Sequence, residues 1–485
     1  MSPQTMNAYT PPTLVSAPQT PIDYQFPRHS SWRVSAHSPT ASYSEIDYDD
    51  ASSILSHVRP TGWRGVFKEG GLGIYLLSTN KGWKVYVGLL CAAVIGSGCA
   101  AMTVDWFIMK GRYSSNVSFL SRNVILIPRT AVFPYPITTT LIQLVGCHLF
   151  LMSLSSFTRL TSSQITDAGL GVIIAPSHAA NEPPPTSSKY RRPKYIPRFL
   201  HRYTRLSTGI AGAGIFEFDR AVVKAVYPLA AVYTLMVLLS NIAYAGTSMR
   251  IWTMIRIGIV PLTAIFTALV NRTWPSFSIV CIALSGALGL LITCIMPQMG
   301  ASPLVVATGI LSSIAAGLFP ELLVNTYAIV LGGQTRLETR ATNRPSTDLY
   351  HTSALCPLDT RATYQLFHHL SVLSIMMLLP IVVLSGELQT ILGTYQHLLE
   401  WQPWFLLSLG SLSTFGVITS TVLLAKGASP LTVNYLSVPM YTVMVIAMAR
   451  GMLEIYAWGG VLTVLVSSGL FWRERVKESS RRDKG

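Results

Sequence analysis

Long uncharged, apolar stretches recur along the chain from residue 85 onward, and charged residues, prolines and glycines separate them. A helix needs about 20 apolar residues to cross a bilayer. The stretches are continuous, whereas the strands of a membrane barrel alternate over about 10 residues. The pattern therefore predicts ten transmembrane helices. We expect them over 85–104, 130–158, 225–249, 251–271, 275–296, 303–331, 362–386, 401–425, 427–449 and 455–472.

Composition agrees with this class of protein. Half of the 485 residues are apolar, only 12% are charged, and the mean hydropathy is +0.43. Soluble domains carry about 25% charged residues, so this chain could not cover a water-facing surface of its size with charge. The six cysteines lack CxxC or Cys/His spacing, so neither a disulfide scaffold nor a metal site is expected. We expect an all-α polytopic membrane protein without a cofactor.

The basic residues are distributed unevenly between the loops. With the N-terminus in the cytoplasm, 27 of the 36 Lys and Arg lie on the cytoplasmic side and 6 on the other. Cytoplasmic loops carry such an excess, so both termini are predicted to be cytoplasmic. The net charge of +15 is then mostly a topology signal, and no nucleic-acid partner is expected.

The chain is predicted to consist of two five-helix halves, two cytoplasmic segments that interrupt them, and two terminal tails. The halves are expected over 85–296 and 303–475. A Pro- and Arg-rich cytoplasmic insertion over 160–222 and a cytoplasmic loop over 333–361 interrupt them, and we interpret both as largely disordered spacers. A disordered cytoplasmic tail over 1–80, a basic cytoplasmic tail over 476–485, and a lumenal glycosylation sequon, Asn116-Val-Ser118, complete the prediction.

Short motifs recur in a fixed order across the spans. They are Phe133-Pro-Tyr-Pro-Ile-Thr138, Tyr227-Pro-Leu-Ala-Ala-Val-Tyr233, Asn241, Arg256, Leu378-Leu-Pro-Ile-Val-Val-Leu-Ser-Gly-Glu-Leu-Gln389, Gly427-Ala-Ser-Pro-Leu-Thr432 and Phe471-Trp-Arg473. Their order and spacing resemble the triose-phosphate/nucleotide-sugar translocator group of the drug/metabolite transporter superfamily, and the GDP-fucose transporters most of all. The resemblance covers about 85 to 475 without the two insertions.

The resemblance implies two inverted five-helix repeats and a multi-pass antiporter of the Golgi or endoplasmic-reticulum membrane. Such a protein exchanges a cytosolic nucleotide-sugar for a lumenal nucleoside monophosphate by alternating access. Pro261 and Pro439 should break the fourth and ninth spans near a midplane site. An enzyme is not expected, because no DxD pair beside a span, HxxxxD motif or metal cluster occurs.

Charged and polar residues inside the spans are the candidate substrate ligands. The fork of the Arg256 guanidinium suits a phosphate, although a structural pairing with Glu321 or with backbone carbonyls is the alternative. Glu321 could orient a sugar hydroxyl, carry a proton, or neutralise Arg256, and we favour the last. Gln143, Asn241 and Asn434 match polar positions of the family, as ligands or as interhelical hydrogen bonds. Tyr441 would stack on a base or sugar, or simply pack.

Several cationic positions of the resembled family are neutral here. Trp106, Ala245 and Met440 stand where the family carries lysines, and Asn325-Thr326 replaces a lysine pair. Truncating one partner of a buried pair costs about 3–5 kcal/mol, so diphosphate binding should weaken. A less charged solute, a rearranged site that uses Arg250, and a non-transporting membrane adaptor remain open. Small-residue faces, Gly96-Ser-Gly98 and Ala283–Gly289, could pack within one protomer or across a homodimer.

Overall fold

The computed structural model describes residues 80–110, 133, 135–168, 170, 173–176, 210–211, 218–272, 274–295, 301–342, 357–393, 401–449 and 453–482. These residues are helical or irregular and include no strand. Ten helical spans among them are long and apolar enough to cross a membrane, and each overlaps one predicted span. The prediction of an all-helical polytopic protein is confirmed. Residues 1–79 of the predicted tail and the sequon at Asn116 lie outside the described residues.

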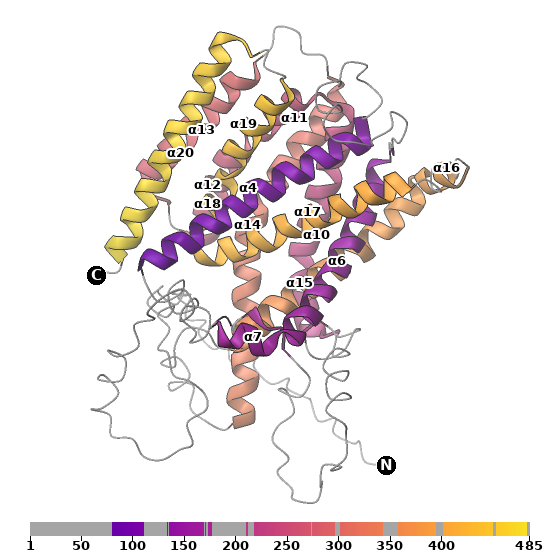
Figure 1. The fold of residues 1–485 in the computed structure, drawn as a ribbon, viewed down its shortest axis with the longest axis vertical. Helices are drawn as coiled ribbons and strands as arrows, with labels where there is room; N and C mark the ends of the chain where they lie inside the picture. Colours follow the sequence, from indigo (N-terminus) through magenta and orange to yellow (C-terminus); the bar gives the residue numbers. More distant parts are fainter. Residues whose placement is uncertain are drawn as a thin grey trace, which may run out of the picture.

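Eight spans are single helices and two are helix pairs. The single helices are α4 (Asn80–Lys110), α6 (Pro136–Leu160), α10 (Arg220–Gly246), α13 (Phe277–Cys294), α14 (Pro303–Thr342), α15 (Pro357–Leu384), α17 (Trp401–Gly427) and α20 (Ile455–Arg482). The fourth span consists of α11 (Met249–Arg256) and α12 (Ile259–Asn271), and the ninth of α18 (Pro430–Tyr435) and α19 (Ser437–Met448). Two short helices, α7 (Ser162–Asp167) and α16 (Glu387–Gly393), lie at the ends of the bundle (Figure 1).

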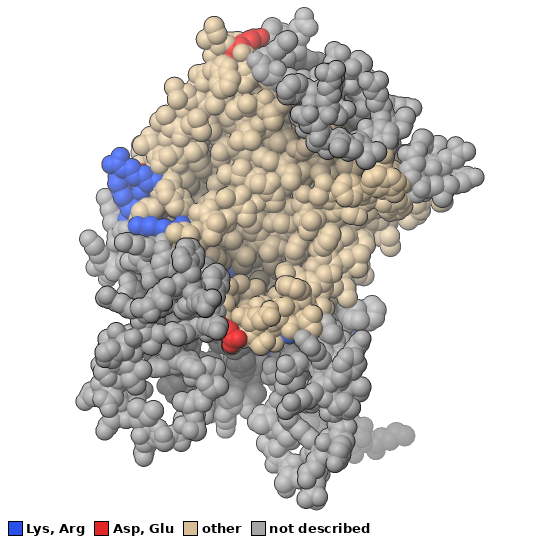
Figure 2. All heavy atoms as spheres, viewed as in Figure 1, with Lys and Arg blue, Asp and Glu red and all other residues tan. Residues whose placement is uncertain are grey.

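The bundle exposes large apolar side chains over most of its sides. Ile455 is 92% exposed and Leu384 is 85% exposed, and many other Leu, Ile, Val and Trp side chains point outward. In the view of Figure 2, Lys, Arg, Asp and Glu lie at the margins, and the broad face between them is nearly free of charge. A soluble monomer rarely exposes so large an apolar surface, whereas lipid would cover it.

Neighbouring helices pair in a regular way. The first span packs on the eighth (α4 on α17), the third on the sixth (α10 on α14), the second on the seventh (α6 on α15) and the fifth on the tenth (α13 on α20) (Figure 1). The fourth and ninth spans also touch, through α12 with α18 and α11 with α19. The pairing is symmetric between the two halves of the chain. Exchanging each span for the corresponding span of the other half, five places away, gives the same set of pairs.

Both halves contain one broken span. The fourth span breaks at Ile257–Gly258, and the ninth breaks at Leu436. Pro261 and Pro439 each occupy the third position of the helix that follows, where the missing N–H of proline removes no intrahelical bond. The prediction that these two spans are broken is confirmed, and the breaks lie about one turn before the prolines.

Part of the insertion over 160–222 is anchored to the bundle, where the sequence predicted a largely disordered spacer. The Arg159 guanidinium donates to the carbonyls of Pro176 (3.1 Å) and Ile210 (3.0 Å), and Ser155 donates to the same Ile210 carbonyl at 3.0 Å. Tyr364 on α15 donates to the carbonyl of Ile173 at 3.0 Å. The described part of the insertion therefore connects α6 to α15, because buried polar groups of both helices find their partners there.

The loop over 333–361 is shorter than predicted. Helix α14 continues to Thr342, and α15 begins at Pro357. Residues 333–342 include Arg336, Leu337, Glu338 and Arg340, which favour a helix even outside the bilayer. Residues 343–356 lie outside the described part of the chain.

A carboxylate from α16 caps the start of α6. The Glu387 oxygens accept from the backbone N–H groups of Ile137 (3.3 Å) and Thr138 (2.7 Å) and from the Thr138 hydroxyl (2.8 Å). Gly386 adopts a φ of 75° just before it, a conformation that favours glycine. An anion at a helix N-terminus satisfies free N–H groups and the helix dipole, so Glu387 fastens the second span to the seventh.

We expect Glu387→Gln to lower the free energy of unfolding by about 1–2 kcal/mol, because the amide carries no charge for the N-terminus of α6. Thermal unfolding of the detergent-solubilised protein measures the effect. The matched control is Asp167→Asn, which neutralises an exposed carboxylate at the C-terminal end of α7. Equal unfolding temperatures for Glu387→Gln and the unsubstituted protein would contradict this role.

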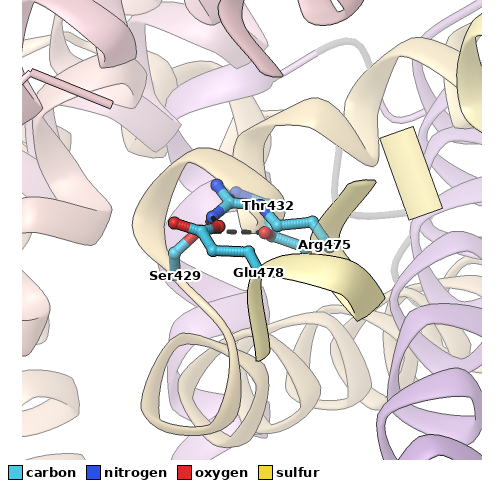
Figure 3. A network of polar contacts seen from close by, with 4 residues as sticks. All are labelled: Ser429, Thr432, Arg475 and Glu478. Atoms are coloured by element: carbon cyan, nitrogen blue, oxygen red, sulfur yellow. Dashed lines mark hydrogen bonds and ion pairs between the residues drawn. The ribbon is translucent and has the colours of Figure 1, made fainter. Parts of the chain in front are cut away.

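The end of α20 lies beside the start of α18. Arg475 forms an ion pair with Glu478 at 2.7 Å, and Ser429, the N-cap of α18, accepts from the Thr432 N–H at 3.2 Å (Figure 3). The Arg475 guanidinium also lies over the Phe471 ring at 5.4 Å. Two ion pairs, Arg475 with Glu478 and Lys477 with Glu474, thus lie in the last turns of α20.

Candidate functional site

A cavity of about 240 Å³ lies in the centre of the bundle. Its walls come from α4, α10, α11, α12, α14, α17, α18 and α19, which belong to the first, third, fourth, sixth, eighth and ninth spans. Both broken spans reach it. Backbone that interrupts a membrane helix is tolerated where it lines a cavity, so the breaks and the cavity have a common structural explanation.

Arg256 lines this cavity at the end of α11, directly before the break in the fourth span. Its side chain is buried, with 8% exposed. One guanidinium nitrogen, Nη1, donates to the hydroxyls of Ser240 (2.6 Å) and Ser312 (3.1 Å), and the guanidinium lies 4.9 Å from the centre of the Trp252 ring. The Nε atom has no hydrogen-bond partner. Every described contact of this cation is therefore neutral.

The expectation that Glu321 neutralises Arg256 is wrong. Glu321 is 1% exposed and accepts from the Thr267 hydroxyl and from the Asn271 amide, the latter at 3.0 Å. Arg256 reaches α14 at Ser312, nine residues before Glu321. At 1.5 Å per residue, the stretch of α14 between Ser312 and Glu321 is about 13.5 Å long. Glu321 is also absent from the cavity wall.

Asn241, Asn434 and Tyr441 line the cavity together with Arg256. The Asn241 amide donates to Thr140 at 2.7 Å, and the Asn434 amide donates to Thr263 at 2.6 Å and to the carbonyl of Ala316 at 3.0 Å. Both amides therefore join helices across the bundle. The interpretation as interhelical hydrogen bonds is confirmed for both residues. Both also line the cavity, and their role as substrate ligands stays a prediction.

Gln143 does not reach the cavity wall. Its amide donates to the carboxylate of Asp105 at 2.6 Å, and it is Asp105 that lines the cavity. The predicted first span ended at residue 104, so Asp105 was not among the candidate ligands. The span continues to Met109 and places this carboxylate inside it, where an ionisable residue is a functional candidate. Gln143 is a positioning residue that holds this carboxylate.

Three aromatic rings form a continuous cluster beside the cavity. Tyr244, Trp252 and Tyr441 pack edge to face, with ring centres 5.2 Å apart in both pairs. The Tyr244 hydroxyl donates to the carbonyl of Met102 at 3.1 Å. All three line the cavity and offer it an apolar aromatic wall. Tyr435 instead stacks on Phe471 at 4.0 Å, outside the cavity wall.

Histidines lie together near the second and seventh spans. The rings of His148 and His368 are 5.5 Å apart, those of His368 and His369 are 5.2 Å apart, and His148 shares a hydrogen bond of 2.8 Å with Ser371. Among the described residues, no group of three or more His, Cys, Asp or Glu could hold a metal ion.

The positions where the resembled family carries lysines differ in their relation to the cavity. Met440 lines it, whereas Trp106, Ala245, Asn325 and Thr326 do not. The charged side chains of the cavity wall are Asp105 and Arg256, one of each sign. The formal charges of the cavity wall therefore sum to zero, and the wall is much less cationic than a diphosphate site should be.

These features define a polytopic membrane protein of ten spans, built around a central cavity that contains opposite charges. No model of a known protein family matches the chain, and no curated protein matches it in sequence.

Proposed function

We propose that this chain is a secondary-active transporter of the drug/metabolite transporter fold. It moves an organic anion, a nucleotide-sugar or a related organic phosphate, across a Golgi or endoplasmic-reticulum membrane in exchange for a nucleoside monophosphate. Alternating access exposes the central cavity to each side in turn. The observation that carries the proposal is Arg256, a buried cation in the cavity wall whose hydrogen-bond partners are serine hydroxyls.

A buried guanidinium without a carboxylate partner is costly. Hydroxyl groups and the Trp252 ring offset part of this cost. An anionic group of a bound solute would offset the rest, and the fork of arginine suits phosphate or carboxylate. The unpartnered Nε of Arg256 supplies a donor for it.

The pairing of spans supports two inverted five-helix repeats. The third span packs on the sixth as the first packs on the eighth, and the broken fourth and ninth spans face each other at the cavity. Transporters with inverted repeats place their substrate site near the midplane, between broken helices. Rocking one half against the other would then change access without rebuilding the site.

The size and charge of the cavity favour a less charged solute as the second candidate. About 240 Å³ lies below the roughly 300–1,000 Å³ of sites for drug-sized ligands. Asp105 in the wall would repel a dianion, since two like charges 10 Å apart interact by about 1.7 kcal/mol at an effective dielectric constant of 20. A monocarboxylate fits better on both grounds than a nucleotide-sugar, whereas a sugar monophosphate, itself nearly a dianion at neutral pH, fits better by size alone.

Proteoliposomes test the proposal directly. Vesicles preloaded with nucleoside monophosphates are offered labelled nucleotide-sugars, sugar phosphates and uncharged or zwitterionic solutes. Saturable uptake that requires a nucleoside monophosphate inside the vesicles supports an antiporter. Saturable uptake without one supports a transporter that is driven in another way. Folded protein that transports none of the panel would contradict transport and favour the non-transporting adaptor.

Met440→Lys should shift selectivity toward more anionic solutes. The substitution places a second cation in the cavity wall, at a position where the resembled family carries lysine. We expect about a tenfold tighter apparent affinity for a nucleoside diphosphate than in the unsubstituted protein, because a desolvated charge pair contributes 1.4 kcal/mol or more. Competition against labelled substrate measures it, with Met440→Leu as the uncharged control. A diphosphate affinity equal in the two variants would contradict the prediction.

A further inference from the structure

The two charges of the central cavity are held apart. Asp105 lies on α4 and accepts from Gln143, while Arg256 lies on α11 and donates to Ser240 and Ser312. No ion pair joins the two groups, although both line the same cavity. Each is hydrogen-bonded to neutral partners, so neither group compensates the other.

Two aromatic rings connect Arg256 to the helix that carries Asp105. The Arg256 guanidinium lies over Trp252, and Trp252 packs edge to face on Tyr244. Tyr244 in turn donates to the carbonyl of Met102, which lies one helical turn before Asp105 on α4. Residues three apart on a helix share a face. Trp252 and Tyr244 thus form an apolar part of the cavity wall that runs from the guanidinium toward the helix that carries the carboxylate.

A ligand complementary to this arrangement has charges of its own at both ends. An anionic group at Arg256 and a protonated amine at Asp105 would pair both buried charges, and an apolar body would lie along Trp252 and Tyr244. A dianion would pair only one of them and would meet the other with repulsion. Leaving either charge buried and unpaired weakens binding, so charge balance selects for a zwitterion.

We infer that the cavity takes a small zwitterionic solute, an amino carboxylate, whose carboxylate binds Arg256 and whose amine binds Asp105. This inference rests on the proposed role of the cavity as the solute site, and it names the substrate class. Gln143 acts as a positioning residue for Asp105, because its amide holds one carboxylate oxygen at 2.6 Å and leaves the other for the amine.

Matched pairs of small molecules test the inference without any mutation. The protein in lipid nanodiscs is titrated with β-alanine and propionate, with γ-aminobutyrate and butyrate, and with ε-aminocaproate and caproate. In each pair the chain is the same and only the amine differs. We expect the amino carboxylate to bind at least tenfold more tightly than its partner for one or more chain lengths, and more tightly than a nucleoside diphosphate.

Substitutions then assign each end of the ligand. Asp105→Asn should reduce the preference for the amino carboxylate to about twofold or less, while Arg256→Gln should weaken both members of the pair. Glu321→Gln is the matched control, since it neutralises another buried carboxylate that lies outside the cavity wall. It should leave the preference unchanged. Size-exclusion profiles and unfolding temperatures confirm that each variant is folded.

Several outcomes would overturn the inference. Carboxylates without an amine could bind as tightly as the amino carboxylates, or Asp105→Asn could keep the full preference. Exchange of organic phosphates by a protein that binds none of the amino carboxylates would overturn this inference and leave the proposed transport function standing. Amino carboxylates that bind with the expected preference but never cross the membrane would support the site and contradict transport.

Discussion

Arg256→Ala is expected to abolish saturable uptake of every anionic solute that the unsubstituted protein carries. Its guanidinium is the cation of the cavity wall, and it is already stripped of water. Losing one partner of a buried, hydrogen-bonded charge pair costs about 3–5 kcal/mol, which corresponds to a loss of more than 100-fold in affinity. Uptake into proteoliposomes at matched protein content measures the effect.

Arg256→Lys separates charge from geometry. Lysine keeps the positive charge but loses the planar fork, in which Nη1 bonds two serine hydroxyls while Nε has no partner. We expect partial activity, well above that of Arg256→Ala. The matched control is Lys426→Gln, which removes a cation that bonds Thr363 at 3.0 Å and lies outside the cavity wall. Uptake by folded Arg256→Ala at the unsubstituted rate would move the substrate site away from this arginine.

The spans could be predicted because the bilayer imposes them locally. Charged residues, prolines and glycines mark the ends of each apolar stretch, so the positions of the spans follow from the pattern of apolar residues alone. The bounds differ where a helix continues into water. Helix α14 runs on to Thr342 and α20 to Arg482, because helix-forming residues extend the element beyond its apolar part. The hydropathy pattern predicts only the apolar part of a helix, so it does not include these polar extensions.

The broken spans were predicted from prolines, although proline alone is not sufficient. Pro228, Pro320 and Pro380 lie inside helices that continue unbroken. What distinguishes Pro261 and Pro439 is their place in the first turn of a new helix beside the cavity. These two prolines were predicted to break their spans because the fourth and ninth spans occupy corresponding places in the two halves. That correspondence came from the resemblance to the transporter family.

The candidate site could be predicted only in part, because contacts between spans decide it. Arg256, Asn241, Asn434 and Tyr441 line one cavity, as expected of polar residues inside spans. The partner of Arg256 was assigned wrongly, since the sequence does not reveal that α11 meets α14 at Ser312 rather than at Glu321. The position of Asp105 at the cavity likewise depends on how α4 rotates about its axis.

Among the described glycines, Gly460 lies closest to the backbone of another helix, and this contact predicts the second large effect. Helices α13 and α20 meet at Gly289 and Gly460. A Cβ atom on Gly460 would lie 2.5 Å from the Gly289 carbonyl oxygen, 2.5 Å from Thr293 Oγ1 and 2.7 Å from the Thr293 nitrogen. Backbone atoms of a packed helix pair cannot move aside cheaply. Small residues allow this approach, as they do at other membrane helix interfaces.

Gly460→Ala is therefore expected to destabilise the protein by about 3 kcal/mol, at the upper end of overpacking effects, and to reduce the yield of folded protein. The adjacent Gly459→Ala is the matched control, because a Cβ there meets nothing within 4 Å and alanine favours the helix. Thermal unfolding of the two variants in the same detergent measures the difference. Equal stabilities would mean that α13 and α20 are farther apart than the structure places them.

The contact between α13 and α20 also bears on whether the small-residue face could form a homodimer interface. The small-residue face Ala283–Gly289 was expected to pack either within one protomer or across two. Gly286 faces Tyr435 and Ser467, and Gly289 faces Gly460 and Thr463, all within the same chain. A dimer built on this face would have to displace α20. If Gly460→Ala unfolds the protein without first changing its oligomeric state, the face serves the fold of the single chain.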